Sequence, residues 1–162
     1  MAAADRGHQD RPGGPGEPGR QRAGAEATPF PPRPPVYVSA LVICQDAFRD
    51  DRGRTHLHGV FDNLNTAGFP VHAQFMVWVS VKGRGVARVV LKIIDTLETA
   101  LAVTEPVMAE VTPFKGHEFF YSFGLSFAGA GLYKVIAYVD GIPAMEVPVT
   151  VRLVPPGAPP AP

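Results

Sequence analysis

The sequence predicts an all-β protein that folds as a two-sheet antiparallel sandwich of seven or eight strands. Between Val36 and Val154, apolar residues recur at every second position rather than at the spacing of a helix face. The apolar runs are short and are bounded by Gly, Asp, Asn and Pro, which favour turns. Strands that follow one another about every ten residues are typical of immunoglobulin-like and fibronectin type III-like sandwiches.

Proline content divides the chain into three parts. Residues 1–35 hold eight of the 18 prolines and residues 155–162 hold five, whereas the segment between them holds only five. The two ends have too few bulky apolar residues to offset the entropy of ordering, so we expect disordered Pro/Gly-rich tails around a β-sandwich domain at 36–154. The stretch at 29–35 is either a stiff spacer or a polyproline ligand for an aromatic groove.

Two hairpins are predicted in the first half of the domain. The strands at 36–46 and 55–62 flank a polar turn and form the first hairpin. The second joins the strands at 73–82 and 86–95, because the Gly-Arg-Gly at 83–85 supplies the positive φ angles of a tight reversal. In the strand at 73–82, alternation turns four side chains inward: Phe75, Val77, Val79 and Val81.

The second half is predicted to contain strands at 97–111, 117–127, 132–139 and 144–153. The first of these segments could instead begin with a helical turn that Pro106 ends. The strand at 117–127 has one wholly apolar face, which identifies it as half-buried.

Several residues in and around the last two predicted strands indicate how these strands are connected and placed. Asp140-Gly141 is a two-residue hairpin signal, and Pro148 confines the last strand to a sheet edge because proline lacks the N–H group. Tyr133, which follows Gly131, is either a tyrosine corner whose hydroxyl bonds to the preceding loop or a plain core tyrosine.

Four short motifs occur in order along the domain. They are an apolar strand ending in Gln-Asp at 40–46, Gly-Val-Phe-Asp at 59–62, Gly-Leu-Tyr at 131–133 and Asp-Gly at 140–141. In these motifs the chain resembles a bacterial family of uncharacterised small β-sandwich proteins, a domain of unknown function. The resemblance implies a fold without an assigned activity. The chain departs from it at His56 and His58, where apolar residues are more usual.

Composition argues against several classes of function. Basic and acidic residues balance at 15 each and charged residues make up 19%, so neither nucleic-acid binding nor attachment to a membrane surface is favoured. No run resembles a signal peptide, and the longest uncharged apolar-rich stretch, 119–133, is too short to span a bilayer. The lone Cys44 fits a reducing, cytoplasmic compartment.

Two catalytic motifs are nearly complete but lack their structural context. Residues 124–128 resemble a nucleophile elbow, yet they lie in a predicted strand and no histidine follows His117. Residues 128–131 resemble a phosphate loop, yet a strand rather than a helix comes next. We therefore expect a protein that is not an enzyme and that holds no cofactor.

His56 and His58 are weak candidates for a metal site. They lie two residues apart in a predicted strand, so both imidazoles project from one face. A tetrahedral shell needs further ligands, such as His72, His117 or Asp62, which nothing in the spacing requires. Cys44, in an apolar strand without a basic residue closely preceding it, is predicted to be a buried, inert thiol.

A binding surface is predicted where two outward-facing pairs of residues meet. With Val77 inward, Met76 and Trp78 face outward, and Ile136 and Tyr138 do the same on the strand at 132–139. In an immunoglobulin-like sandwich these strands would be neighbours and would gather all four residues into one exposed apolar cluster. The opposite register would bury Trp78 in the core.

Three classes of function remain open, of which the first is favoured. It is an interaction module that binds a protein partner, or itself, through a sheet face or edge. The second is a sandwich that binds carbohydrate or another small ligand, with Trp78 and Tyr138 stacking on a sugar ring. The third is a metal-dependent enzyme that uses His56 and His58.

Overall fold

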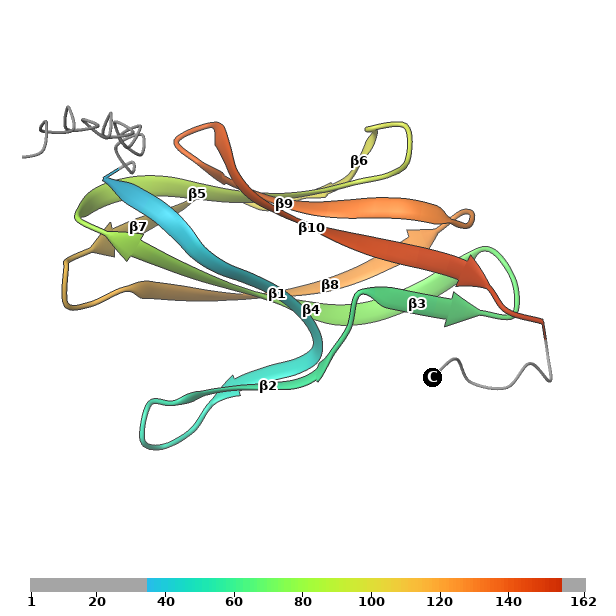
Figure 1. The fold of residues 1–162 in the computed structure, drawn as a ribbon, viewed down its shortest axis with the longest axis horizontal. Helices are drawn as coiled ribbons and strands as arrows, with labels where there is room; N and C mark the ends of the chain where they lie inside the picture. Colours follow the sequence, from blue (N-terminus) through green and yellow to red (C-terminus); the bar gives the residue numbers. More distant parts are fainter. Residues whose placement is uncertain (1–34, 156–162) are drawn as a thin grey trace, which may run out of the picture. The chain divides into compact units, whose positions relative to one another are not determined.

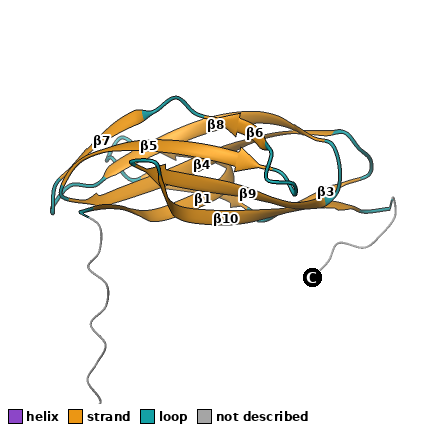
Figure 2. Ribbon diagram, turned by 90° about the horizontal axis from the view of Figure 1, so that it is seen from above, coloured by secondary structure: helices purple, strands orange, loops and turns teal. Residues whose placement is uncertain are grey.

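The computed structural model describes residues 35–155, which form two β-sheets packed face to face (Figures 1 and 2). The tails predicted at 1–35 and 155–162 lie outside the described residues, except for Pro35 and Pro155. The ten strands are β1 (Val36–Arg49), β2 (Thr55–Val60), β3 (Asn63–Thr66), β4 (Val71–Gly83), β5 (Gly85–Ile94), β6 (Ala100–Val103), β7 (Val107–Val111), β8 (His117–Phe127), β9 (Gly131–Val139) and β10 (Ile142–Leu153).

The predicted all-β immunoglobulin-like sandwich is confirmed. Sheet A has the strand order β2-β1-β4-β8, and sheet B has the order β3-β10-β9-β5-β6, with β7 also paired to β5. All strand pairs are antiparallel except β3 with the end of β10. Ten strands form instead of seven or eight, because the chain crosses between sheets at Asp62 and because a break at Pro106, which lacks an N–H group, separates β6 from β7. The helical turn considered for 97–111 is absent from this segment.

Two of the three predicted hairpins form. β1 pairs with β2, and β9 pairs with β10 through Asp140 and Gly141, whose φ angles of 51° and 84° suit a two-residue turn. The hairpin predicted at 83–85 is wrong. Gly83 and Gly85 do have positive φ, at 128° and 123°, but the chain there crosses from β4 in sheet A to β5 in sheet B. Local turn chemistry permits a reversal without deciding which strands pair across it.

The core lies between the inward faces of the two sheets. β4 contributes Phe75, Val77, Val79 and Val81, as predicted, and the three valines are completely buried. Pro148 lies at a sheet edge, as predicted, because β10 pairs with its second neighbour, β3, only from Thr150 onward. Proline therefore lies where β10 is still a sheet edge.

Tyr133 forms a tyrosine corner, one of the two roles that the sequence left open for it. Its side chain is 5% exposed, and its hydroxyl donates a hydrogen bond of 2.8 Å to the carbonyl oxygen of Gly129 in the preceding loop. The ring meets Phe127 edge to face, with ring centroids 4.8 Å apart. This bond ties the β8–β9 loop to the core.

We predict that Tyr133→Phe lowers the free energy of unfolding by about 1 kcal/mol, because it removes the hydrogen bond and leaves the Gly129 carbonyl without this donor. Urea denaturation measures the change. Tyr138→Phe, on the outer face of sheet B, is the matched control and should leave stability unchanged. Equal stability of the Tyr133→Phe variant and the wild type would show that the corner is not stabilising.

Candidate functional site

The four residues predicted to form one exposed cluster lie on opposite sides of the sandwich. Met76 and Trp78 are on β4 in sheet A, whereas Ile136 and Tyr138 are on β9 in sheet B. Met76, Trp78 and Tyr138 lie outside the central core and are partly buried. The exposure predicted for Ile136 is wrong, because this side chain is buried and only 9% exposed. The assumption that β4 and β9 are neighbours is wrong, because β1 and β8 flank β4 while β10 and β5 flank β9. Trp78 and Tyr138 therefore cannot stack on one sugar ring.

The β1–β2 hairpin covers part of the outer face on which Trp78 lies. β4 separates β1 from β8 in sheet A, yet Arg49 and Thr55 at the turn of the hairpin both reach Glu118 on β8. Arg49 Nη2 donates to Glu118 Oε2 at 2.8 Å, and Thr55 Oγ1 donates to the same oxygen at 2.5 Å. The hairpin must therefore bend across β4, as the curvature of β1 in Figure 1 indicates.

Glu118 holds the β1–β2 hairpin to β8. Burial opposes ionisation of its carboxyl group, but hydrogen bonds from Thr55 and Arg49 and the nearby indole N–H of Trp78 outweigh that effect and hold its pKa below the usual value. The Trp78 N–H is buried and makes no hydrogen bond of ordinary length within residues 35–155.

The tip of the hairpin is organised by Asp50. His56 Nε2 lies 3.0 Å from Asp50 Oδ2, and Arg54 Nε lies 2.8 Å from the same oxygen. The contact with His56, together with hydrogen bonds from the turn, lowers the pKa of Asp50 to about 2. The His56 ring also stacks on Phe48, whose centroid is 5.1 Å away. His56 is therefore engaged in the turn.

No group of three potential metal-ligating side chains (His, Cys, Asp or Glu) comes together within the described part of the chain. His58 lies opposite Asp46 in the β1–β2 register and is exposed, while His56 faces Phe48. Cys44 is completely buried, as predicted, and burial raises the pKa of its thiol, with a further contribution from Asp46. A buried thiol of raised pKa is a poor nucleophile.

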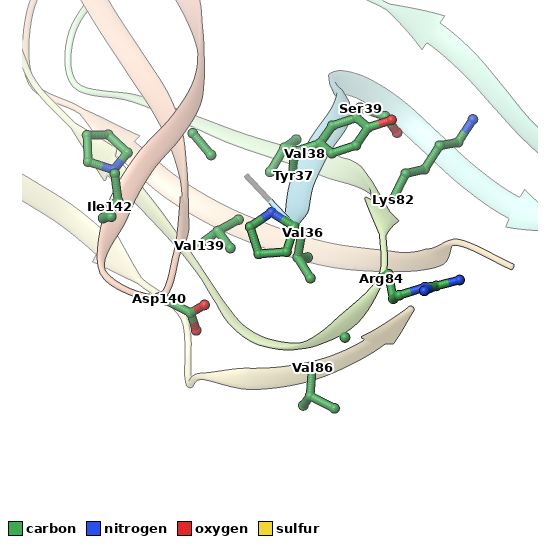
Figure 3. Close-up of a pocket in the computed structure, with 14 residues that line it drawn as sticks. Val36, Tyr37, Val38, Ser39, Lys82, Arg84, Val86, Val139, Asp140 and Ile142 are labelled. Atoms are coloured by element: carbon green, nitrogen blue, oxygen red, sulfur yellow. The ribbon is translucent and has the colours of Figure 1, made fainter. Parts of the chain in front are cut away.

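A groove with a volume of about 980 Å³, here called the end groove, lies where β1 begins (Figure 3). The start of β1, the β4–β5 connection and the β9–β10 hairpin supply its walls. Its apolar lining comes mainly from Val36, Val38, Val86, Val139 and Ile142. Val86 is 60% and Ile142 69% exposed, so these two side chains supply the apolar surface that is open to solvent. Val36, Val38 and Val139 are buried beneath it.

Charged side chains flank the end groove. Figure 3 shows Lys82 and Arg84 extending on one side, with Asp140 and Ile142 on the other. The Asp140 carboxylate is partly engaged, since it accepts the backbone N–H of Arg88 at 2.8 Å. Within residues 35–155, neither Lys82 nor Arg84 forms an ion pair with an acidic side chain.

A second hollow, of about 460 Å³, continues from the end groove toward the β7–β8 turn. The two hollows share Pro35, Tyr37, Lys82 and Arg84. The far side of the second hollow is formed by Phe114, which is completely exposed. Lys82 and Arg84 therefore lie between two apolar surfaces.

An unpaired strand edge borders the end groove. From Val38 to Val42, β1 pairs with β4 on one side only within residues 35–155, and β2 takes the other side from Cys44 onward. Such an edge offers backbone N–H and C=O groups to an extended segment. The combined site can thus provide main-chain hydrogen bonds, aliphatic contacts and positive charge.

The sequence analysis did not predict the end groove, although residues that form its walls lie in or next to recognisable turns. The glycines at 83 and 85 and the Asp-Gly at 140–141 mark turns, and Phe114 lies in a turn between two strands. Nothing local shows that these turns meet at the same end of the sandwich. That meeting follows from long-range strand pairing.

The fold and the end groove define an immunoglobulin-like β-sandwich domain with an open end. The chain belongs to the Family of unknown function (DUF6941), whose family model matches residues 39–152. This confirms the resemblance to an uncharacterised family of small β-sandwich proteins. No curated protein matches the sequence. Residues 35–155 contain no helix long and apolar enough to cross a membrane.

Several solved structures are similar in fold to this chain. An alkylpurine DNA glycosylase of Pseudomonas fluorescens, bound to DNA, is 8% identical with a TM-score of 0.46, over 73% of this chain and 30% of the glycosylase. The CARDB domain of a Pyrococcus furiosus protein, solved with two metal ions, is 16% identical with a TM-score of 0.40, over 72% of this chain and 90% of the domain. An immunoglobulin-like protein of Pseudomonas aeruginosa is 12% identical with a TM-score of 0.38, over 72% of this chain and 96% of that protein.

This chain thus spans less than a third of the glycosylase. At these identities and TM-scores, the similarities say nothing about what the chain binds.

We predict that Glu118→Gln lowers the free energy of unfolding by about 1 kcal/mol at pH 7, because it weakens the hydrogen bonds from Arg49 and Thr55. The pKa of Glu118 is lower in the folded chain than its ordinary 4.5, so ionised Glu118 stabilises the fold above pH 4.5. That contribution is lost as the pH falls through the lowered folded-state value. The difference between wild type and variant should therefore shrink in acid.

Urea unfolding followed by the fluorescence of the single tryptophan, Trp78, measures this difference at pH 7 and pH 3. Glu105→Gln, which changes an exposed carboxylate between β6 and β7, is the control and should behave like wild type at both pH values. A Glu118→Gln difference that is the same at both pH values would contradict the assigned role.

Proposed function

We propose that this protein is a non-enzymatic interaction module that binds an extended segment of a partner protein in the end groove. The observation that carries the proposal is the joining of an aliphatic groove, an unpaired strand edge and two basic side chains at one end of the sandwich. An extended segment can satisfy all three at once, through its backbone, its apolar side chains and a carboxylate.

Exposed apolar surface supports this proposal. Val86, Ile142 and Phe114 are each more than half exposed and line two adjoining hollows. Monomeric proteins expose single apolar residues freely, but apolar residues grouped around a groove indicate a site of contact. The walls of the end groove are largely aliphatic rather than aromatic, which favours a peptide over a sugar ring.

The position of the basic residues suggests the chemistry of the partner. Lys82 and Arg84 line both hollows, so a segment that crosses from one hollow to the other passes these two side chains. A matching segment would carry Asp or Glu between two apolar residues. Electrostatic complementarity of this kind favours rapid association and a defined orientation.

We predict that selection from a phage-displayed library of random linear peptides enriches sequences in which an acidic residue separates two bulky apolar residues. Arg84→Glu and Ile142→Asp should each weaken binding of an enriched peptide at least about tenfold, as measured by fluorescence anisotropy. Both side chains are exposed, so neither change should unfold the domain.

Matched controls lie at the opposite end of β10. Arg152→Glu repeats the charge reversal and Leu153→Asp repeats the apolar-to-acidic change at exposed positions away from the end groove. Both should bind the peptide like wild type. Equal loss of binding in the control variants, or failure to enrich any peptide, would reject the proposal.

A further inference from the structure

β8 is a long and regular edge strand on the side of the sandwich opposite β1 and β10 (Figure 2). It has 11 residues, and within the described part of the chain it pairs only with β4. The β4–β8 register runs from Val71 opposite Phe127 to Val81 opposite His117 without a shift. Every second residue of β8 therefore turns its backbone N–H and C=O groups toward an unpaired edge.

The other edges of the two sheets are shorter or interrupted. The strands β2, β3, β6 and β7 have only four to six residues each, and β10 contains Pro143 and Pro148. β8 contains no proline, no lysine and no bulge. Proteins use such features to prevent unwanted pairing of sheet edges, so their absence from β8 indicates an edge that pairs.

We propose that β8 pairs antiparallel with β8 of a second copy of the chain, which joins the two four-stranded sheets A into one continuous sheet. A two-fold axis at Ser122 uses all 11 residues of the strand. In this register Ser122 faces Ser122 of the second copy, Phe120 faces Gly124, and Glu118 faces Ser126. No like charges lie opposite each other, and inward residues pair with inward residues.

The two halves of β8 have complementary outer faces. In the first half, Glu118 and Phe120 are partly buried, and Arg49 of the hairpin lies over the Phe120 ring at 5.9 Å. In the second half, Ser122, Gly124 and Ser126 are small and exposed.

The two-fold axis sets the bulky half of one copy beside the small half of the other. An atom added at the Cβ position of Gly124 would meet nothing within 4 Å, so there is room for the Phe120 ring of the second copy. An aromatic ring beside a glycine of a neighbouring strand is a stabilising cross-strand pair.

The inner face extends the core in the same register. Phe119 would face Leu125, and Tyr121 would face Phe123, all of them on the apolar face of β8. Tyr121 and Phe123 are only partly buried in the single chain. Pairing of the edges would therefore add apolar contacts to the backbone hydrogen bonds. No residue of β8 lines the end groove.

A crosslinking experiment on the full chain tests both the pairing and its register. Ser122→Cys places two thiols opposite each other at the two-fold axis, where Cβ atoms of facing residues are about 5 Å apart and can form a disulfide after small adjustment. Ser126→Cys places the two thiols about 27 Å apart, eight residues along the strands. Under mild oxidation at equal concentration, the Ser122→Cys variant should form a covalent dimer and the Ser126→Cys variant should not. The buried Cys44 is common to both.

Charge variants test the same register without a covalent bond. Ser122→Lys sets two lysines opposite each other and should weaken dimerisation by roughly tenfold in sedimentation equilibrium. Ser126→Lys adds the same charge but faces Glu118, so it should preserve the dimer. Both positions are exposed, and thermal unfolding at low protein concentration checks that each single chain still folds. A wild-type chain that stays monomeric at about 0.5 mM, or equal crosslinking of both cysteine variants, would overturn the proposal.

Discussion

Burial of alternate side chains between two sheets is the constraint on which the rest of this structure depends. Val77, Val79 and Val81 of β4 and Val89 and Leu91 of β5 have no exposed surface. Removing aliphatic surface from water is the largest favourable contribution to folding, at roughly 25 cal/mol per Å². A slip of one residue in any central strand would turn its apolar face to solvent, so burial also sets the register.

The same constraint determines which strand edges keep unpaired backbone groups. A sandwich satisfies the backbone of its central strands but leaves edges on two sides. On one side, β1 and β10 leave an edge and a groove, and the β4–β5 and β9–β10 connections bring apolar and basic residues to it. On the other side lies β8. Both proposed contacts use the edges that the fold itself leaves open.

The outer face of sheet A differs from these open edges, because another part of the chain covers it. There the chain covers its own surface, because the β1–β2 hairpin bends over β4 and is held to β8 through Glu118. This contact explains why Trp78 is neither a core residue nor an open binding surface. It also explains how a carboxylate can lie beside a buried indole N–H, since two hydrogen-bond donors from the hairpin keep that carboxylate ionised.

The sequence by itself determined most of the strand segments, which faces of them are buried and where several turns lie, although it missed β3 and did not separate β6 from β7. Alternation, glycine and proline act over a few residues, so the inward face of β4, the Asp140-Gly141 turn and the edge position of Pro148 could all be predicted. The partners of each strand were decided only by the tertiary structure. Pairing β4 with β1 and β8 instead of β5, and placing β9 in the other sheet, depends on how distant apolar faces pack together. For that reason the cluster expected around Trp78 and Tyr138 does not form, and the end groove joins residues whose proximity no local pattern reveals.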